Sequence, residues 1–144
     1  MRKTKFFTIF IAVLIGVSCA SNKKINDMKE FINEAARCTE MFIAQISESA
    51  NEGDIVSTIE AFSKSLTILA EQSSAIKKKY PDIDLLLNEP PAELTSALDK
   101  LHITEKQLKE VLKSDKVREL IKDSKVQSAF TNLINELEKV KFFQ

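Results

Sequence analysis

Glycine, proline, histidine and tryptophan are scarce in this chain of 144 residues. It has two glycines, three prolines, one histidine and no tryptophan. Because glycine and proline interrupt regular elements, and because a phosphate-binding loop needs several glycines, this composition favours long helices and argues against a nucleotide-binding protein. With one histidine and two cysteines, the sequence lacks the ligands of a zinc site and the motif of a covalent haem. We therefore expect no metal and no cofactor.

Residues that could serve an enzyme are equally few. Nucleophilic catalysis by a serine–histidine pair would depend on His102, and nothing in the sequence marks a serine as its partner. Asp99 and His102 have the spacing of a di-iron motif, but that site needs a second histidine, which the chain does not have. We therefore predict that the protein is not an enzyme.

The charge balance excludes another class of partner. The chain has 21 basic and 21 acidic residues, without the basic excess that binds nucleic acid. Charge is uneven, since residues 25–71 contain nine acidic and three basic side chains. This part is expected to be an ordinary solvated surface or a docking face for a basic protein partner. The candidate partner face consists of Asp27, Glu30, Glu34, Glu40, Glu48 and Glu60.

The first nineteen residues hold the clearest functional signal. Residues 1–5 carry three positive charges, residues 6–17 are apolar, and Cys19 follows. A basic region, an apolar region and small residues before a cut are the layout of a secretory signal peptide. The layout resembles the signal peptide of a bacterial lipoprotein, with residues 16–19 (Gly-Val-Ser-Cys) as the cleavage box.

The resemblance implies that residues 1–18 are removed and that Cys19 becomes a lipidated N-terminus held in a membrane. It implies an exported protein of the cell envelope, anchored at the outer membrane and facing the periplasm or the cell surface. Gly16 departs from the aliphatic residue usual at its position, so two alternatives stay open. One is ordinary cleavage after Ala20, which would give a secreted protein. The other is an uncleaved anchor, although about twelve apolar residues are fewer than the roughly twenty that span a bilayer.

Hydrophobic spacing indicates a single helical domain over residues 25–144, after a short tether at residues 19–24. Between residues 24 and 52, apolar or small residues recur at steps of three and four, which predicts a long amphipathic helix. Its stripe is Ile25, Met28, Ile32, Ala35, Thr39, Phe42, Ile46 and Ser49. The same spacing predicts a second helix over residues 55–80. Its stripe is Ile55, Ile59, Phe62, Leu66, Leu69, Ser73, Ile76 and Tyr80.

A very short link joins these two helices, so they are expected to fold back antiparallel. Within the link, Gly53 is predicted to take the left-handed conformation after the first helix, and Asp54 to cap the second. Pro81 is expected to end the second helix. The apolar residues 83–87 are then expected to pack over one end of the bundle.

The C-terminal part of the sequence predicts two more helices. One covers residues 92–113, with a capping box at Thr104 that could bend or restart it. The other begins at Asp115 and is either continuous or split near Asp123. We therefore predict an all-α fold, an antiparallel hairpin extended to a four-helix bundle. Cys38, beside the first stripe, is expected to be buried and unreactive, and to pair with Cys19 only if that residue carries no lipid.

Taken together, these features predict a non-enzymatic envelope lipoprotein that presents a helical surface to a protein partner. An alternative is a bundle that holds a small apolar ligand, because small core positions beside Phe42 and Phe62 could leave a gap. The basic cluster at residues 77–79 suits the negative end of the second helix. It would contact lipid headgroups if that end lies near the membrane.

Overall fold

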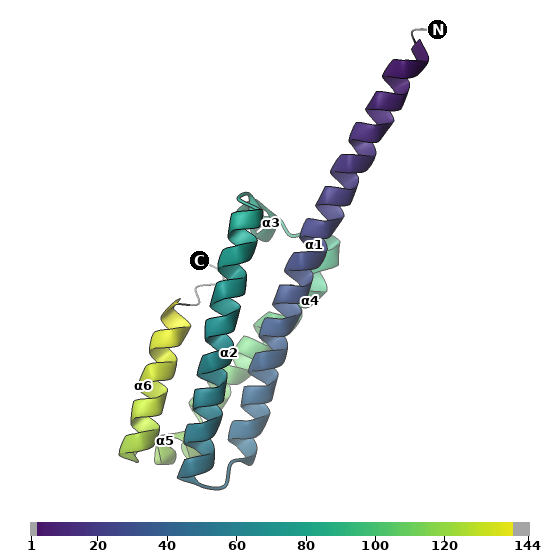
Figure 1. Ribbon diagram of the computed structural model, residues 1–144. Helices are drawn as coiled ribbons and strands as arrows, with labels where there is room; N and C mark the ends of the chain where they lie inside the picture. The colour runs from purple at the N-terminus through teal and green to yellow at the C-terminus, as the bar shows by residue number, and fades with distance from the viewer. Residues whose placement is uncertain (1–2, 140–144) are drawn as a thin grey trace.

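The central element of the structure is a hairpin of two long helices (Figure 1). The computed structural model describes the backbone of residues 3–139 and the side chains of residues 22–137. In it, α1 spans Lys3–Glu48 and α2 spans Glu52–Lys79, and the two helices run antiparallel. The predicted stripes explain the pairing, because they place apolar side chains on one face of each helix. Met28 and all later members of the first stripe are buried, as are the members of the second stripe from Ile55 to Leu69.

The link between α1 and α2 differs from the prediction. Asn51, and not Asp54, is the N-cap of α2. Its Oδ1 accepts the backbone N–H of Asp54 at 2.9 Å, and its Nδ2 donates to the Asp54 carboxylate at 2.7 Å. Gly53 lies in the first turn of α2, and no glycine among the described residues has a positive φ. Because the Asn51 side chain satisfies a free N–H at the helix start, α2 begins at Glu52 and needs no left-handed glycine before it.

α1 also begins earlier than predicted. Residues 19–24, expected as a tether, belong to the continuous helix α1, and the Lys24 ammonium lies 2.7 Å from the Asp82 carboxylate. Figure 1 shows α1 extending past the end of the bundle. The side chains of residues 1–21 are outside the described residues, and with them the predicted signal peptide and the lipidation site Cys19. Within the part whose side chains are described, no helix is long and apolar enough to cross a bilayer.

The same helix separates the two cysteines. Cys19 and Cys38 are both in α1, and 19 residues at 1.5 Å per residue correspond to about 28 Å along the axis. A disulfide needs Cα atoms within about 7 Å. An intramolecular Cys19–Cys38 bond is therefore incompatible with this fold.

Four further helices follow the hairpin. They are α3 (Ile83–Asn88), α4 (Ala92–Leu112), α5 (Asp115–Leu120) and α6 (Ser124–Lys139). The prediction that residues 83–87 cover one end is confirmed by α3, whose Ile83 is buried. The predicted restart at Thr104 is wrong, since its buried hydroxyl donates to the Lys100 carbonyl at 2.7 Å within an unbroken α4. The last helix is split, and Asp123 caps α6 by accepting the N–H groups of Lys125 and Val126.

The two flanking helices pack parallel to their neighbours in the hairpin. α4 lies against α1, and α6 lies against α2. Glu40 of α1 pairs with Lys100 of α4 at 3.3 Å. Further along α1, the Ser47 carbonyl accepts a hydrogen bond at 2.7 Å from Lys116 of α5, which follows α4. α1 and α4 therefore run in the same direction. α3 and α5 make this possible, because each carries the chain from one side of the hairpin to the other at opposite ends of the bundle (Figure 1).

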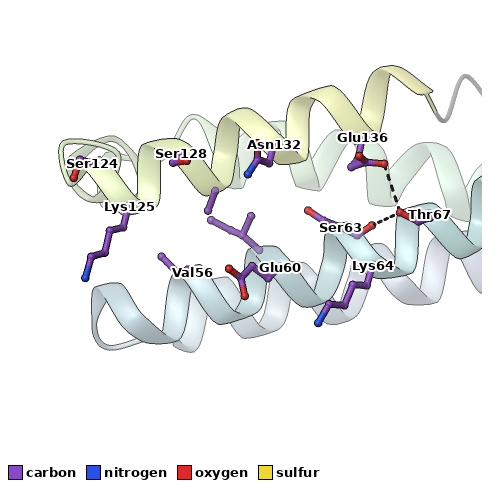
Figure 2. Close-up of a pocket in the computed structure, with 12 residues that line it drawn as sticks. Val56, Glu60, Ser63, Lys64, Thr67, Ser124, Lys125, Ser128, Asn132 and Glu136 are labelled. Carbon is purple, nitrogen blue, oxygen red and sulfur yellow. Dashed lines mark hydrogen bonds between the residues drawn. The ribbon is translucent and has the colours of Figure 1, made fainter.

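The groove between α2 and α6 shows the same parallel register (Figure 2). The Thr67 hydroxyl lies 3.5 Å from the Glu136 carboxylate, and it also donates to the Ser63 carbonyl at 3.2 Å. Towards the other end of the groove, Val56 of α2 lines the same space as Lys125 of α6.

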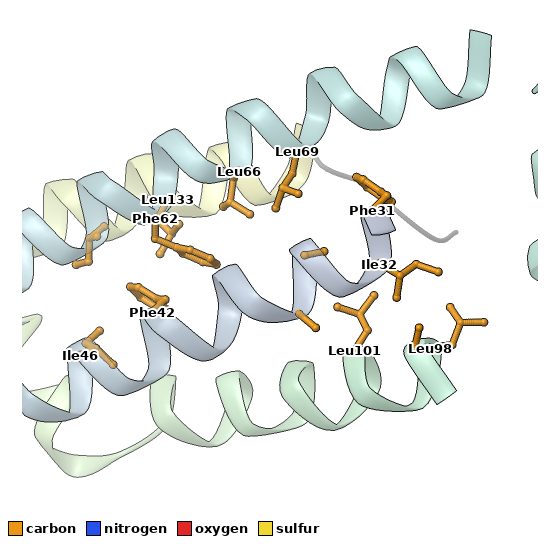
Figure 3. Packing of buried hydrophobic residues seen from close by; sticks show 14 of the residues in the cluster. Phe31, Ile32, Phe42, Ile46, Phe62, Leu66, Leu69, Leu98, Leu101 and Leu133 are labelled. Carbon is orange, nitrogen blue, oxygen red and sulfur yellow. The ribbon is translucent and has the colours of Figure 1, made fainter. Parts of the chain in front are cut away.

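All four long helices supply buried residues to the core, which lies between neighbouring helices (Figure 3). The Phe42 and Phe62 rings stack with centroids 4.3 Å apart and an interplanar angle of 12°. The buried hydroxyls do not leave polar groups unsatisfied: Thr39 donates to the Ala35 carbonyl at 2.9 Å, as Thr104 does to that of Lys100. No buried side-chain nitrogen or oxygen among the described residues lacks a hydrogen-bond partner.

Candidate functional site

The side of the hairpin that α4 and α6 leave uncovered is the main candidate surface. On each helix its residues recur at steps of three, four, seven or fourteen, so they follow one stripe. We call this surface the outer hairpin face; it consists of Asp27, Glu30, Glu34, Met41 and Glu48 on α1 and of Asp54, Ile68, Gln72 and Lys79 on α2. Two open grooves between α1 and α2 mark it, one of about 550 Å³ near Asp27 and Lys79 and one of about 380 Å³ near Glu48 and Asp54.

At one end of this face an ion pair joins the two helices. The Asp27 carboxylate accepts hydrogen bonds from the Lys79 ammonium at 2.5 Å and from the Tyr80 hydroxyl at 2.7 Å. These two bonds hold the pKa of Asp27 below its usual value, and the bond from Lys79 has the larger effect. The same bond to Asp27 raises the pKa of Lys79, whose ammonium also lies 5.1 Å from the centre of the Tyr80 ring. This end of the face is therefore locally neutral.

Two turns further on, a second ion pair lies within α1. Arg37 donates to both carboxylate oxygens of Glu34, at 2.9 and 2.6 Å, which lowers the pKa of Glu34. The half-buried Cys38 thiol donates to the same carboxylate at 3.6 Å. Burial, and then the negative charge of Glu34, raise the pKa of Cys38. The thiol is therefore protonated at neutral pH and is a poor nucleophile.

The six acidic residues predicted as one partner face are divided by the fold. Asp27, Glu30, Glu34 and Glu48 follow a single stripe of α1 on the outer hairpin face. Glu40 instead pairs with Lys100 of α4 beside a groove of about 740 Å³. Glu60 lines the separate groove between α2 and α6. Only four of the six residues therefore share a surface, because the packing of α4 and α6 assigns the other two to different grooves.

Two exposed apolar side chains on the outer hairpin face were not among the predicted site residues. Met41 of α1 is 47% exposed and Ile68 of α2 is 56% exposed. Their spacing could have identified them, since Met41 is seven residues from both Glu34 and Glu48, on the acidic stripe and off the core stripe. The face thus combines apolar side chains with acidic ones. Large hydrophobic residues are rarely left in water without a structural or functional reason when they gather on one face.

The groove between α2 and α6 is the second candidate (Figure 2). It has a volume of about 740 Å³, is open to solvent and is lined mostly by polar side chains, among them Ser63, Thr67, Ser128 and Asn132. The positive charges of Lys64 and Lys125 are balanced by the negative charges of Glu60 and Glu136, so the residues that line the groove have no net charge. Its hydroxyls are the kind that bridge adjacent helices through water.

The one histidine of the chain is not part of a catalytic or metal-binding group among the described residues. His102 and Asp99 are both exposed on α4. In the part of the chain that the structure describes, no three histidine, cysteine, aspartate or glutamate side chains are grouped so that they could hold a metal ion.

Comparisons of this chain with protein-family models, with curated proteins and with solved structures find no match.

Proposed function

We propose that the protein is a non-enzymatic lipoprotein of the bacterial envelope, whose helical bundle presents the outer hairpin face to a basic protein partner. The membrane part of this proposal is supported by the layout of residues 1–19. The partner part is carried by one observation: exposed Met41 lies on the α1 stripe with Glu30 and Glu48, and exposed Ile68 lies on the α2 stripe with Asp54. A helix with apolar and basic side chains would match this combination of surface apolar groups and negative charge.

The packing of the bundle supports an interaction role over the ligand-binding alternative. The ligand-binding alternative needs a gap beside Phe42 and Phe62, but the two rings stack directly on each other. The described grooves are open to solvent, whereas a small apolar ligand is usually enclosed on most of its surface. An enzymatic role has less support, because the acidic residues with shifted pKa values, Asp27, Glu34 and Asp82, are bonded to cations. The Cys38 thiol beside Glu34 has a raised pKa and is a poor nucleophile.

The anchor is tested on Cys19. The intact mass of protein purified from its native membrane should equal that of residues 19–144 plus acyl chains. A Cys19→Ala variant should no longer fractionate with membranes once the leader is cleaved. A mass that begins at Ser21 would favour plain secretion, and a variant that is cleaved and still membrane-bound would contradict the lipid anchor.

The partner is tested by crosslinking in native envelopes. A photoreactive residue at Gln72, which is exposed on the same face, should capture a specific basic protein, and the yield should fall at high ionic strength because surface charge attraction is screened. The double variant Met41→Glu/Ile68→Glu should lose the capture. The matched control Ile103→Glu, at a residue that is 59% exposed on α4, should keep it. Recovery of no protein, or equal recovery with both variants, would contradict the proposal.

A further inference from the structure

The end of the bundle that α3 covers carries a cluster of lysines from two helices. Lys23 of α1 and Lys77 and Lys78 of α2 are exposed there. Two ion pairs bring these segments together: Lys79 with Asp27, and Lys24 with Asp82 at 2.7 Å. The pairs fix the start of the packed part of α1 against the end of α2. The exposed lysines therefore lie at one end of the bundle although they are more than fifty residues apart in the sequence.

Acidic side chains neutralise this surface only in part. Asp27 and Asp82 each hold one lysine, and Asp84 lies 4.0 Å from Lys77. Where α1 and α2 meet α3, five lysines therefore face three aspartates. Glu89 and Glu93 are exposed farther along the chain, where it passes from α3 into α4, so the excess positive charge belongs to the α1 and α2 side of this end. This is the reverse of the outer hairpin face, where acidic residues are in excess.

An apolar side chain is exposed on the same end. Leu85 of α3 is 71% exposed, more than the other exposed large hydrophobic residues, Met41, Ile68, Ile103 and Ile134. α3 is held in place by its buried Ile83, and its Leu86 and Leu87 pack partly against the core. Leu85 is therefore presented outward by an anchored helix, next to Asp84 and its neighbour Lys77.

The direction of α1 relates this end to the N-terminal apolar run. α1 passes the α3 end and continues towards Cys19 and residues 6–17 (Figure 1). Four residues separate Cys19 from Lys23, a rise of about 6 Å in a helix. The Debye length at physiological ionic strength is about 8 Å. A membrane that holds Cys19 would thus bring its surface charge within electrostatic reach of these lysines.

We propose that the α3 end of the bundle rests on an anionic lipid bilayer, with Lys23, Lys77 and Lys78 at the headgroup phosphates and Leu85 in the interfacial layer. This inference rests on the membrane anchoring in the proposed function. Basic side chains attract anionic headgroups, and an exposed leucine adds apolar burial at the interface, so the contact gives the anchored bundle a preferred orientation. The long axis of the hairpin then stands away from the membrane, and the outer hairpin face stays accessible along its length.

Photocrosslinking to lipid tests the contact directly. The protein is purified from membranes with the N-terminus that it carries there, with benzoylphenylalanine in place of Leu85 or, as a control, of Ile103. It is reconstituted in vesicles of phosphatidylcholine, with or without phosphatidylglycerol. Lipid adducts, measured by mass, should be several-fold more abundant from position 85 than from position 103. They should also increase several-fold when phosphatidylglycerol is present.

The lysines are tested in the same assay. The triple variant K23Q/K77Q/K78Q should bring the phosphatidylglycerol yield at position 85 down to the phosphatidylcholine level. The control K113Q/K122Q/K125Q removes three exposed lysines from the opposite end and should leave the yield unchanged. Equal adduct yields at positions 85 and 103, or equal effects of the two triple variants, would overturn the inference.

Flotation of the same samples separates this inference from the proposed anchor. Protein that floats with both vesicles but crosslinks equally from both positions is anchored without this contact. Protein that floats only with phosphatidylglycerol vesicles, and crosslinks from position 85, makes the contact but lacks an anchor. Protein that floats with neither vesicle contradicts both proposals.

Discussion

At the scale of single residues, ion pairs between elements make the fold sensitive to acid. Asp27 is bonded to Lys79 and Tyr80, and the bond from Lys24 lowers the pKa of Asp82 in the same way. Because the pKa of both carboxyls is lower in the folded than in the unfolded chain, their ionised forms stabilise the fold at neutral pH. This contribution is lost as the pH falls below the unfolded value of about 3.9 towards the folded pKa.

We therefore expect the free energy of unfolding to fall in acid, and to fall less in Asp27→Asn and Asp82→Asn variants. The measurement is urea unfolding, followed by circular dichroism, at about pH 6 and about pH 3. Asp99→Asn, at an exposed aspartate of α4, is the matched control and should behave as the parent chain does. An unchanged pH dependence in both ion-pair variants would show that these bonds do not stabilise the fold.

The Cys38 thiol permits a second prediction at this scale. Its pKa is raised by burial and by Glu34, so alkylation of the folded chain should follow a higher apparent pKa than alkylation of the chain in urea. Glu34→Gln should lower that value, and Glu30→Gln, one turn away, should not. Iodoacetamide rates across a pH series, in a Cys19→Ser background, provide the measurement. Equal apparent pKa values in the folded and unfolded chains would contradict the prediction.

At the scale of secondary structure, capping decides where the hairpin turns. Asn51 accepts the Asp54 N–H, so Asn51→Ala should reduce the free energy of unfolding by about 1 kcal/mol. Glu52→Ala, in the same turn but without a capping bond, is the control and should change it less. Chemical denaturation of the three proteins gives the values. If Asn51→Ala costs no more than Glu52→Ala, the turn does not depend on this cap.

At the scale of the whole molecule, the unusual feature is parallel packing of the flanking helices against a central antiparallel hairpin. Thr67 and Glu136 are in contact, whereas Val56 and Glu136 line opposite ends of the same groove. Eleven residues of helix separate Val56 from Thr67, or about 16 Å. Parallel packing therefore predicts which pairs of positions can be linked.

A short bismaleimide should join a Thr67→Cys/Glu136→Cys pair efficiently and a Val56→Cys/Glu136→Cys pair poorly. Cys19 and Cys38 are replaced by serine in both proteins, and the linked product is measured by its mass and by its mobility after denaturation. If α6 instead ran antiparallel to α2, the order of the two yields would be reversed.

The sequence by itself determined the helices and their buried faces. Residues spaced three and four apart bring one face of a helix together whatever packs on it, so Ile32, Phe42, Ile59 and Leu66 could be assigned to the core from spacing alone. Pro81 ends α2 for an equally local reason. The turn was predicted less well, because Asn51, Gly53 and Asp54 are all plausible capping or turn residues and only their geometry distinguishes them.

Tertiary structure alone decided which surfaces the acidic residues share. Glu30, Glu40 and Glu60 are equally polar in the sequence, but Glu40 faces α4, Glu60 faces α6 and only Glu30 stays on the outer hairpin face. It also decided that Lys23 and Lys77 lie on one end, through ion pairs between distant segments. Spacing along a helix is a local property, so it can be read from the sequence. Which helix packs on each face depends on how α3 and α5 cross the bundle, and only the tertiary structure fixes that.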